Sequence, residues 1–439
     1  MRIAVLGAGI AGVTTAYFLA RDGHEVTVVE GGLEVVGETS RANGGVAGVT
    51  QVEPWAQPDL PWKLLTWIGR KDAPILIRFG EVVRHYWWGL RFLRRCMKEA
   101  YLEGLAVNTR LTLHSLEMFA RVREELGMTG EEYDLNRGGA LKLYFSKQSF
   151  GDALELAQRL EGMGCGARPV APETAAELEP ALAPRVHEIA SALFFPQEEI
   201  GDCRKFALRL EEACKRLGVR FAFDTNVHRL LVRDGMVAAA ETSEGAIGAD
   251  LFVIALASRT AALLRPLGIP VPIVPVKDVT VTVPAAPWGD AIRSGIMDHA
   301  RLYGLMRIGD RLRISGSAEF AGFDVVPAEA RCQALIRNVL PLFPGFAVCL
   351  KAAKPQMWAG VRPTTPDGSP ILGRTPIGNL FINAGHGPQG WSTSCGSARV
   401  VADLVSGRVP AISMDGLGLD RFGSAGGSVI AGGVNHAGR

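Results

Sequence analysis

Near the N-terminus, the spacing of apolar residues changes from a strand pattern to a helical pattern and back to a strand pattern. Residues 2–6 form a short apolar run, residues 10–21 repeat apolar side chains at helical spacing, and residues 24–30 return to a strand pattern. A strand, a helix and a second strand in so short a stretch are typical of the start of a doubly wound parallel sheet. We therefore expect an α/β fold that opens with a Rossmann-like unit.

The rest of the chain alternates between helical and strand patterns. Residues 227–257 predict a β meander with turns at Asp234-Gly235 and Glu244-Gly245. Helical patterns cover 61–127, 151–163 and 202–218, strand patterns cover 138–146, 219–224 and 271–320, and glycines separate strand, loop and helix patterns from 355 to 407. Residues 423–439 are small and glycine-rich, which predicts a flexible tail.

Composition narrows the class of protein. The chain has 439 residues, 48% of them hydrophobic, and a net charge of +2, which does not indicate a nucleic-acid binder. Its seven cysteines are odd in number and contain no Cys-x-x-Cys pair, so we expect neither a disulfide framework nor a metal site. No signal peptide and no membrane-spanning apolar run is apparent, which favours a cytoplasmic enzyme.

The first glycine loop, "GAGIAG", lies between the first strand and the first helix. Gly7, Gly9 and Gly12 match the G-x-G-x-x-G pattern, and Ile10 and Ala11 open the helix whose N-terminal amides would face a pyrophosphate. Glu30 ends the second strand, where an acid can accept hydrogen bonds from a ribose. The alternative is an ordinary strand-to-helix turn, but the complete pattern favours a dinucleotide, FAD or NAD rather than NADP.

A second polar loop, "GETSRANGG" at 37–45, follows closely. Its hydroxyl, amide and glycine groups at Thr39, Ser40, Asn43 and Gly44 suit the pyrophosphate and ribityl oxygens of FAD. The alternative is a polar surface loop.

Three runs resemble the FAD-dependent D-amino-acid dehydrogenases of bacteria, within the glycine oxidase and sarcosine oxidase superfamily. The similarity extends over residues 1 to about 422, in the same order. The runs are "GHEVTVVE" with "ETSRANGG", then "PQEEIGDCRKF" leading to "GVRFAFDTNV", and last "WAGVRPTTPDGSPILGRTPIGNLFINAGHGPQGWSTSCGSARVVADLVSGRVP".

This resemblance implies a fold and an activity. It implies a Rossmann-like FAD-binding domain built from discontinuous segments and an α+β substrate domain with a mixed or antiparallel sheet. The expected segments are 1–52, 186–274 and 352–422 for FAD, and 53–185 and 275–351 for substrate. It also implies oxidation of a D-amino acid to a 2-oxo acid and ammonia, with a quinone or other carrier as electron acceptor. We expect FAD to be bound without a covalent bond, because no cysteine falls at 385–391 and the nearest, Cys395, lies within the expected helix.

A second glycine loop, "INAGHGPQGWSTSCG", is explained by the same resemblance. The loop would meet the flavin ring, and a helix starting near Pro388 would point its amides at the ring's pyrimidine side, where negative charge gathers on reduction. By position, the resemblance assigns these cofactor contacts to Gly360, Gly387, Gln389, Gly390 and Trp391, and the adenine contact to Val227. His386 would touch the ring or, alternatively, face solvent or a carbonyl, and Val227 is alternatively a buried strand residue.

The substrate side rests on two residues. Arg362 matches the position that grips the substrate carboxylate, for which a bidentate guanidinium is suited; the alternative is a pair with Asp367. Tyr303 matches a strand lining the pocket and could donate its hydroxyl to the carboxylate, with core packing as the alternative. Hydride can pass directly to flavin N5, so no catalytic triad is needed.

The chain departs from the family pattern at Gly31 and Gly32, Val46, Asp278-Val279 and Pro388. The departures leave open which amine is oxidised, and they keep D-hydroxyproline, glycine or a sarcosine-like amine as alternatives, with oxygen as a possible acceptor. A non-catalytic FAD-binding subunit of a hetero-oligomer and an NAD-dependent dehydrogenase are the other classes. The oligomeric state is open.

Residues 61–100 combine four tryptophans with a local charge of +6, from nine basic and three acidic residues. Tryptophan favours the headgroup region of a bilayer, and basic residues are attracted to anionic lipid. We expect peripheral contact with the cytoplasmic face of a membrane. The alternative is that the tryptophans pack in the substrate domain and the arginines are its solvated face.

Overall fold

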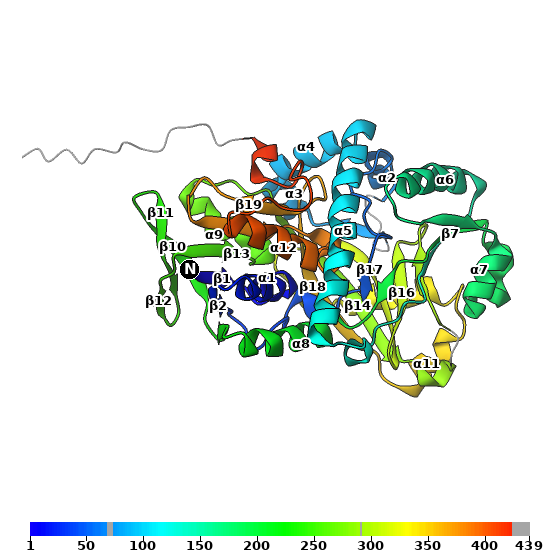
Figure 1. The fold of residues 1–439 in the computed structure, drawn as a ribbon. Helices are drawn as coiled ribbons and strands as arrows, with labels where there is room; N and C mark the ends of the chain where they lie inside the picture. Colours follow the sequence, from blue (N-terminus) through cyan, green and yellow to red (C-terminus); the bar gives the residue numbers. More distant parts are fainter. Residues whose placement is uncertain (68–72, 290–291, 424–439) are drawn as a thin grey trace, which may run out of the picture.

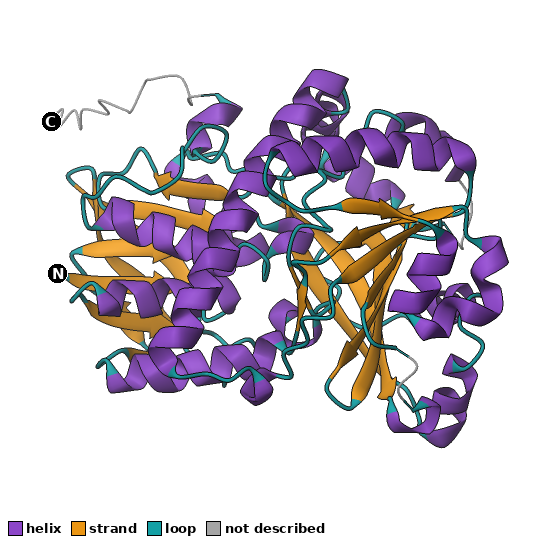
Figure 2. Cartoon of the chain, turned by 45° about the vertical axis from the view of Figure 1, so that its right-hand side comes forward, coloured by secondary structure: helices purple, strands orange, loops and turns teal. Residues whose placement is uncertain are grey.

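The computed structural model describes residues 1–67, 73–289 and 292–423 (Figure 1). The predicted tail lies outside these residues except for Gly423, as do Arg70 and Lys71 of the basic segment. The body of the molecule contains two large sheets with helices around them (Figure 2). The N-terminal strand lies in the first sheet, and the second sheet lies on the other side of the molecule.

The first sheet has six strands in the order β19-β20-β13-β1-β2-β9. All of its neighbouring strands are parallel except the pair β19 and β20. The strands are β1 (Arg2–Leu6), β2 (Glu25–Val29), β9 (Arg220–Ala222), β13 (Leu251–Ile254), β19 (Ile371–Arg374) and β20 (Leu380–Ala384). This is the predicted Rossmann-like sheet, and it is built from three separate segments, as expected.

Helices α1 (Ile10–Arg21), α5 (Lys98–Leu126), α8 (Cys203–Arg216) and α12 (Ser394–Val405) cover this sheet and share one apolar core with it. Helix α1 is buried almost all round, which explains its nearly unbroken apolar sequence. Asp202 caps α8 by accepting from the Arg204 and Lys205 amides at 2.9 and 3.1 Å. Helix α5 falls in the predicted substrate segment but packs on α12, so it belongs to both parts of the molecule.

The second sheet has nine strands, of which β14 (Val274–Pro284) and β17 (Arg311–Phe320) are the longest. Its other strands are β4 (Ile75–Ile77), β5 (Ala140–Tyr144), β6 (Arg168–Val170), β7 (Ser191–Phe195), β15 (Gly295–Asp298), β16 (Tyr303–Ile308) and β18 (Gln356–Thr364). The predicted FAD-binding segments 186–274 and 352–422 include β7 and β18, but in the structure both strands belong to the second sheet. Strand β18 belongs there because it pairs antiparallel with β14 over its whole length.

The predicted meander is correct only in part. Strands β10 (Val227–Arg233), β11 (Met236–Thr242) and β12 (Gly245–Ile247) form a separate antiparallel sheet, whereas β13 leaves them and joins β1 in parallel.

The remaining strands and α-helices are β3 (Val46–Ala47), β8 (Glu199–Ile200), α2 (Leu60–Trp67), α3 (Phe79–Arg84), α4 (Tyr86–Arg95), α6 (Lys147–Gly162), α7 (Pro172–Leu178), α9 (Thr260–Leu264), α10 (Glu329–Val339) and α11 (Phe346–Ala352). Among the described residues no helix is long and apolar enough to cross a bilayer.

Candidate active site

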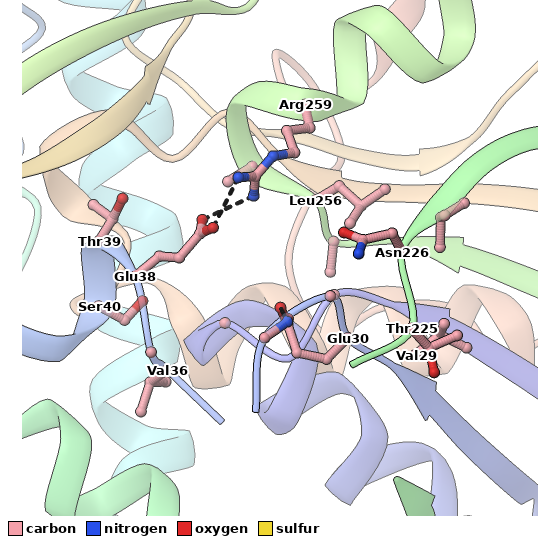
Figure 3. A pocket seen from close by; sticks show the side chains of 18 of the residues that line it. Val29, Glu30, Val36, Glu38, Thr39, Ser40, Thr225, Asn226, Leu256 and Arg259 are labelled. Atoms are coloured by element: carbon pink, nitrogen blue, oxygen red, sulfur yellow. Dashed lines mark hydrogen bonds and ion pairs between the residues drawn. The ribbon is translucent and has the colours of Figure 1, made fainter. Parts of the chain in front are cut away.

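A cavity of about 1040 Å³ opens at the carboxyl ends of β1 and β2. Its walls carry Gly7, Gly9, Glu30 and Val227, all of them predicted cofactor residues, together with the loop after β2. Figure 3 shows this wall, with Glu30 and Asn226 on one side and an ion pair between Arg259 and Glu38 on the other. The cavity has the place and size that a dinucleotide requires at a Rossmann switch point.

The three glycines of the first loop differ in why glycine is needed at each position. Gly7 has φ +106, and a Cβ there would lie 2.6 Å from the Ala255 carbonyl oxygen, whereas a Cβ on Gly12 would lie 1.9 Å from the Gly7 carbonyl oxygen. Gly9 is different, because its nearest atom would be Ser40 Oγ at 4.0 Å. Gly7 and Gly12 therefore serve the fold, and the open space at Gly9 is the space that a pyrophosphate would fill.

Glu30 is held in place by two backbone amides. Its carboxylate accepts from the Ala8 amide at 2.6 Å and from the Gly32 amide at 2.8 Å. Each oxygen keeps a free lone pair, so a ribose diol can still donate to Glu30. The predicted departure at Gly31 and Gly32 thus has a local role, since the Gly32 amide fixes the acid.

A second, smaller cavity of about 60 Å³ continues from the first, with which it shares Thr39 and Ser40. Both glycine loops meet here. The predicted cofactor residues that line it are Ile10, Thr39, Ser40, Asn43, Gly360, Gly387, Gly390 and Trp391. Ala11, in the first turn of α1, Gly44 and Gln389 are not among its lining residues.

Three buried polar atoms at this second cavity have no hydrogen-bond partner among the described residues: Thr280 Oγ1, Trp358 Nε1 and Trp391 Nε1. Buried polar groups are normally paired. A flat ring with polar atoms on its edge, continuous with a pyrophosphate and ribose, would meet such donors. The donor set and the space at Gly9 therefore fit FAD.

The loop 39–45 is fastened to strand β18 by Thr39. Thr39 Oγ1 donates to the Val361 carbonyl and accepts from the Val361 amide, both at 3.0 Å. A Cβ on Gly360 would lie 3.0 Å from Thr39 Cα, and one on Gly44 would lie 2.9 Å from Ser315 Oγ. Asn43 Oδ1 accepts from the Gly45 amide at 3.0 Å. Thr39, Asn43 and Gly360 line the second cavity, which supports a role of this loop in cofactor binding.

The second glycine loop differs from the prediction in one respect. Residues 387–389 form a short 3-10 turn, and α12 begins only at Ser394, so no long helix starts at Pro388. Gly387 has φ +53, and a Cβ there would meet no described atom within 4 Å, so this residue leaves the cavity open. Gln389 is buried, and its Oε1 has no partner among the described residues.

His386 is a structural residue in this loop. It is 4% exposed, with Nε2 2.9 Å from Asn383 Oδ1 and Nδ1 2.9 Å from Thr393 Oγ1. Burial lowers its pKa to about 4, so the ring is neutral near pH 7. Both ring nitrogens have partners within the protein, so the solvent-facing alternative is wrong, and the contact with the flavin ring stays a prediction.

A third cavity of about 240 Å³ adjoins the second and shares Asp278, Arg362 and Pro388 with it. Glu53, Lys142 and His299 lie at its walls, with Tyr303. Lys142 forms a buried ion pair with Glu53, which also accepts from Tyr101 Oη at 2.8 Å. Burial lowers the pKa of His299 to about 4. The cavity is thus partly charged but contains a neutral imidazole.

Arg362 reaches this third cavity as predicted, but its partner is different. It forms an ion pair with Asp278, whereas Asp367 pairs with Arg421 at 2.8 Å, so the predicted alternative of an Arg362–Asp367 pair is wrong. Burial raises the pKa of Asp278, although the Arg362 charge opposes the shift. From the sequence, the departure at Asp278-Val279 was expected near the ring or the substrate pocket, but Asp278 was given no role; the signal was an acid beside Lys277 in a strand of β-branched residues.

Tyr303 lies at the start of β16 and is 3% exposed. Its hydroxyl makes no hydrogen bond within the described part of the chain, and burial together with the neighbouring Asp298 carboxylate raises its pKa well above the ordinary value. The phenol is therefore protonated and lines the cavity, with the Asp298 carboxylate as the neighbouring acceptor for its hydrogen.

No covalent or metal attachment is apparent in the described residues. All seven cysteines are free and buried, and no group of three or more His, Cys, Asp or Glu side chains could hold a metal ion there. Cys395 lies inside α12, away from the loop 385–391. None of these cysteines lies in the loop 385–391 or lines the first two cavities.

The fold and the joined cavities define a two-domain flavoprotein oxidoreductase. The chain matches the model of the FAD dependent oxidoreductase family over residues 2–404. It is 40% identical to a D-amino acid dehydrogenase of Paramagnetospirillum magneticum over 97% of this chain and 99% of the relative, and 40% identical to one of Methylobacterium radiotolerans over 96% and 100%. The chain belongs to this family of FAD-dependent oxidoreductases.

A solved structure agrees on the fold. Glycine oxidase from Geobacillus kaustophilus superposes with a TM-score of 0.76 at 23% identity, covering 96% of this chain and 99% of the other. The predicted family, fold class and cofactor are confirmed.

Proposed function

We propose that the chain is an FAD-dependent dehydrogenase that oxidises D-amino acids to 2-oxo acids and ammonia. The observation that carries the proposal is the third cavity, which adjoins the second cavity, called the flavin slot from here on, and has Arg362 and Tyr303 on its walls. A guanidinium in an enclosed site suits a carboxylate. The two relatives named D-amino acid dehydrogenase, matched over almost their whole length, support the stereochemical assignment.

The chain's own residues would bind and orient the substrate. Arg362 holds the carboxylate through guanidinium N–H groups that Asp278 does not use, and Tyr303 donates its hydroxyl to the same group. This places Cα at the wall that the third cavity shares with the slot. When bound, FAD would supply the two-electron oxidant that accepts the Cα hydrogen as hydride; the amine would lose a proton, and water would hydrolyse the imine to the 2-oxo acid and ammonia.

The cofactor would be held along the joined first and second cavities. Gly9 and the first amides of α1, at Ile10 and Ala11, would face the pyrophosphate, with Glu30 at a ribose and Val227 beside the adenine. Ser40, Asn43, Gly387, Gly390 and Trp391 would surround the ring end. Thr39, Gly44 and Gly360 shape the loop, and Gln389 and His386 support the turn behind it.

We further propose a quinone or similar carrier as electron acceptor, reached from a lipid surface. A fourth cavity of about 270 Å³ shares Thr39, Trp358 and Gly360 with the flavin slot. Its outer lining includes Phe323 and Val325, which are more than half exposed. The lining also carries the ion pair between Glu38 and Arg259, so the apolar contacts for an acceptor would come from Phe323 and Val325. The membrane contact itself is proposed through helices α3 and α4 of the 61–100 segment, on the cytoplasmic side.

The test is an anaerobic panel of D- and L-amino acids mixed with the FAD-loaded protein, with loss of the oxidised flavin absorbance as the readout. We expect several D-amino acids to bleach the flavin and their L-enantiomers to leave it oxidised. Bleaching by glycine, sarcosine or D-hydroxyproline alone would contradict the proposal in favour of another small amine. Bleaching by no amine, with FAD bound, would indicate a non-catalytic subunit.

A further inference from the structure

The ion pair between Asp278 and Arg362 forms the wall shared by the flavin slot and the substrate cavity. The two residues come from the adjacent antiparallel strands β14 and β18. Arg362 pairs in register with Val276, two residues before Asp278. Residues two apart on a strand share a face, so the register brings both charged side chains to the cavity side of the sheet.

The ion pair leaves hydrogen-bonding groups of Arg362 and Asp278 available for a ligand. Arg362 donates through Nη2 only, to Asp278 Oδ2. Within the described residues, no other side chain binds Asp278, and the other guanidinium nitrogens have no partner. Both side chains are largely buried, at 16% and 9% exposure. The Val279 amide also faces the Asp278 carboxylate, whose oxygens keep further lone pairs. A buried pair with free guanidinium donors and such lone pairs at a cavity can bind a ligand that carries both charges.

We propose that Asp278 binds the ammonium group of the substrate, so that the Arg362–Asp278 pair recognises both charges of an amino-acid zwitterion. The inference rests on the proposed function in taking an amino acid as the substrate. Adding a zwitterion to this pair keeps the enclosed site neutral, whereas a carboxylate alone would bring an uncompensated negative charge beside Asp278.

This arrangement also provides specificity against acids without an amine. Arg362 alone would hold any small carboxylate, including the 2-oxo acid product. Asp278 weakens the binding of such acids by like-charge repulsion and by competing for the guanidinium, which favours product release. The competing interpretation is that Asp278 only orients Arg362 and never touches a ligand.

Calorimetry on the FAD-loaded protein separates the two interpretations with a matched pair of ligands. 2-Methylalanine is a zwitterion without a Cα hydrogen, so it cannot be oxidised, and 2-methylpropanoate is the same acid without the amine. In Asp278→Asn we expect the affinity for 2-methylalanine to fall by about 30-fold or more, while that for 2-methylpropanoate stays constant or rises. Asp367→Asn, which breaks the buried pair with Arg421 outside the cavity, is the control and should change neither.

Equal weakening of both ligands in Asp278→Asn would overturn the proposal, because it is the result for an orienting role. Should that variant fail to fold, the wild-type protein decides: it should bind 2-methylalanine at least about tenfold more tightly than 2-methylpropanoate. The reverse order would also overturn the inference. Because this readout needs no turnover, it is independent of whether the panel of D-amino acids bleaches the flavin.

Discussion

At the scale of single residues, Arg362 is the side chain on which substrate binding most depends. We predict that Arg362→Lys lowers kcat/KM for D-amino acids, mainly by raising KM, and that the loss corresponds to about 2–4 kcal/mol of transition-state stabilisation. Lysine keeps the charge but cannot bind Asp278 and a carboxylate in the same geometry. Steady-state kinetics with a dye acceptor measure this. Arg421→Lys, at a buried pair away from the cavities, is the matched control. Unchanged kinetics in Arg362→Lys would show that Arg362 does not bind the carboxylate.

Glu198 is a second residue with a measurable signature, in this case on stability. It is fully buried and accepts hydrogen bonds from the Val49 and Thr50 amides and from Thr50 Oγ1, yet burial raises its pKa to about 7 from an ordinary 4.5. Because the folded state binds the proton more tightly, the contribution of Glu198 to stability is full below about pH 4.5 and is lost as the pH rises through about 7.

The expected size of this loss is roughly 3 kcal/mol. Glu198→Gln keeps a carbonyl for the two amides and removes the titration, so its free energy of unfolding relative to wild type should rise by that amount between about pH 5 and pH 8. Urea unfolding at the two pH values measures the difference. Glu244→Gln, on an exposed hairpin turn, should show none. Parallel curves for Glu198→Gln and wild type would contradict the prediction.

At the scale of elements, the first strand, turn and helix separate folding from cofactor binding. Gly9→Ala has room for its Cβ in the protein but places it where a pyrophosphate would lie. We predict a folded protein with normal circular dichroism and FAD affinity reduced by about tenfold or more, since the contact of an oriented amide with phosphate is lost. Fluorescence titration of the apoprotein with FAD measures it.

Gly151→Ala, in the exposed middle of α6 with nothing near its Cβ, is the control for Gly9→Ala. It should leave FAD affinity unchanged and raise stability by about 0.5–1 kcal/mol. Tight FAD binding by Gly9→Ala would place the pyrophosphate elsewhere.

Local periodicity accounts for what could be predicted at this scale. β1, α1, β2 and α8 each carry their own apolar pattern and turn residues, so they were correct to within a residue or two. The Asp278–Arg362 pair was not predictable, because its members are 84 residues apart and meet only through the register of β14 and β18. The start of α12 was missed because the Gly-Pro sequence has helix-start features, while the fold uses it for an isolated 3-10 turn.

At the scale of the whole molecule, the basic tryptophan-rich segment divides into two parts. It is not one helix but α2, β4, α3, α4 and the start of α5. Trp88 is buried, stacks on Phe92 at 5.1 Å and donates to the Thr364 carbonyl at 3.2 Å, as the core-packing alternative expected. Trp62 and Trp87 are 73% and 66% exposed. Adjacent tryptophans with opposite environments cannot be told apart from composition.

The exposed part forms one surface, the α3–α4 surface, which we define by Val82, Val83, Tyr86, Trp87, Leu90, Leu93, Arg91 and Arg94. Arg91 and Arg94 have no ion-pair partner among the described residues, whereas Arg84 pairs with Glu81 and Arg78 with Glu319. Arg78, the residue before α3, pairs with Glu319 of β17 and with Asp324, which holds the start of this surface beside the loop that carries Phe323 and Val325. Helix α4 lies at the upper edge of the molecule in Figure 1, where a flat bilayer could approach it.

We predict that the protein sediments with anionic vesicles at low salt and is released at high salt, and that neutral vesicles retain little of it. Charge reversal in Arg91→Glu/Arg94→Glu should weaken binding by at least about 2 kcal/mol, since each basic residue near an anionic surface contributes roughly 1 kcal/mol. Reversal of Arg216 and Arg233, which are exposed on α8 and β10, is the control with equal net charge and should have a small effect. Equal loss in both double variants would indicate attraction through net charge rather than a docking surface. Protein that stays in the supernatant with anionic vesicles at low salt would leave the α3–α4 surface as a face for a protein partner, because exposed tryptophan beside unpaired arginine is also the composition of interfaces between proteins.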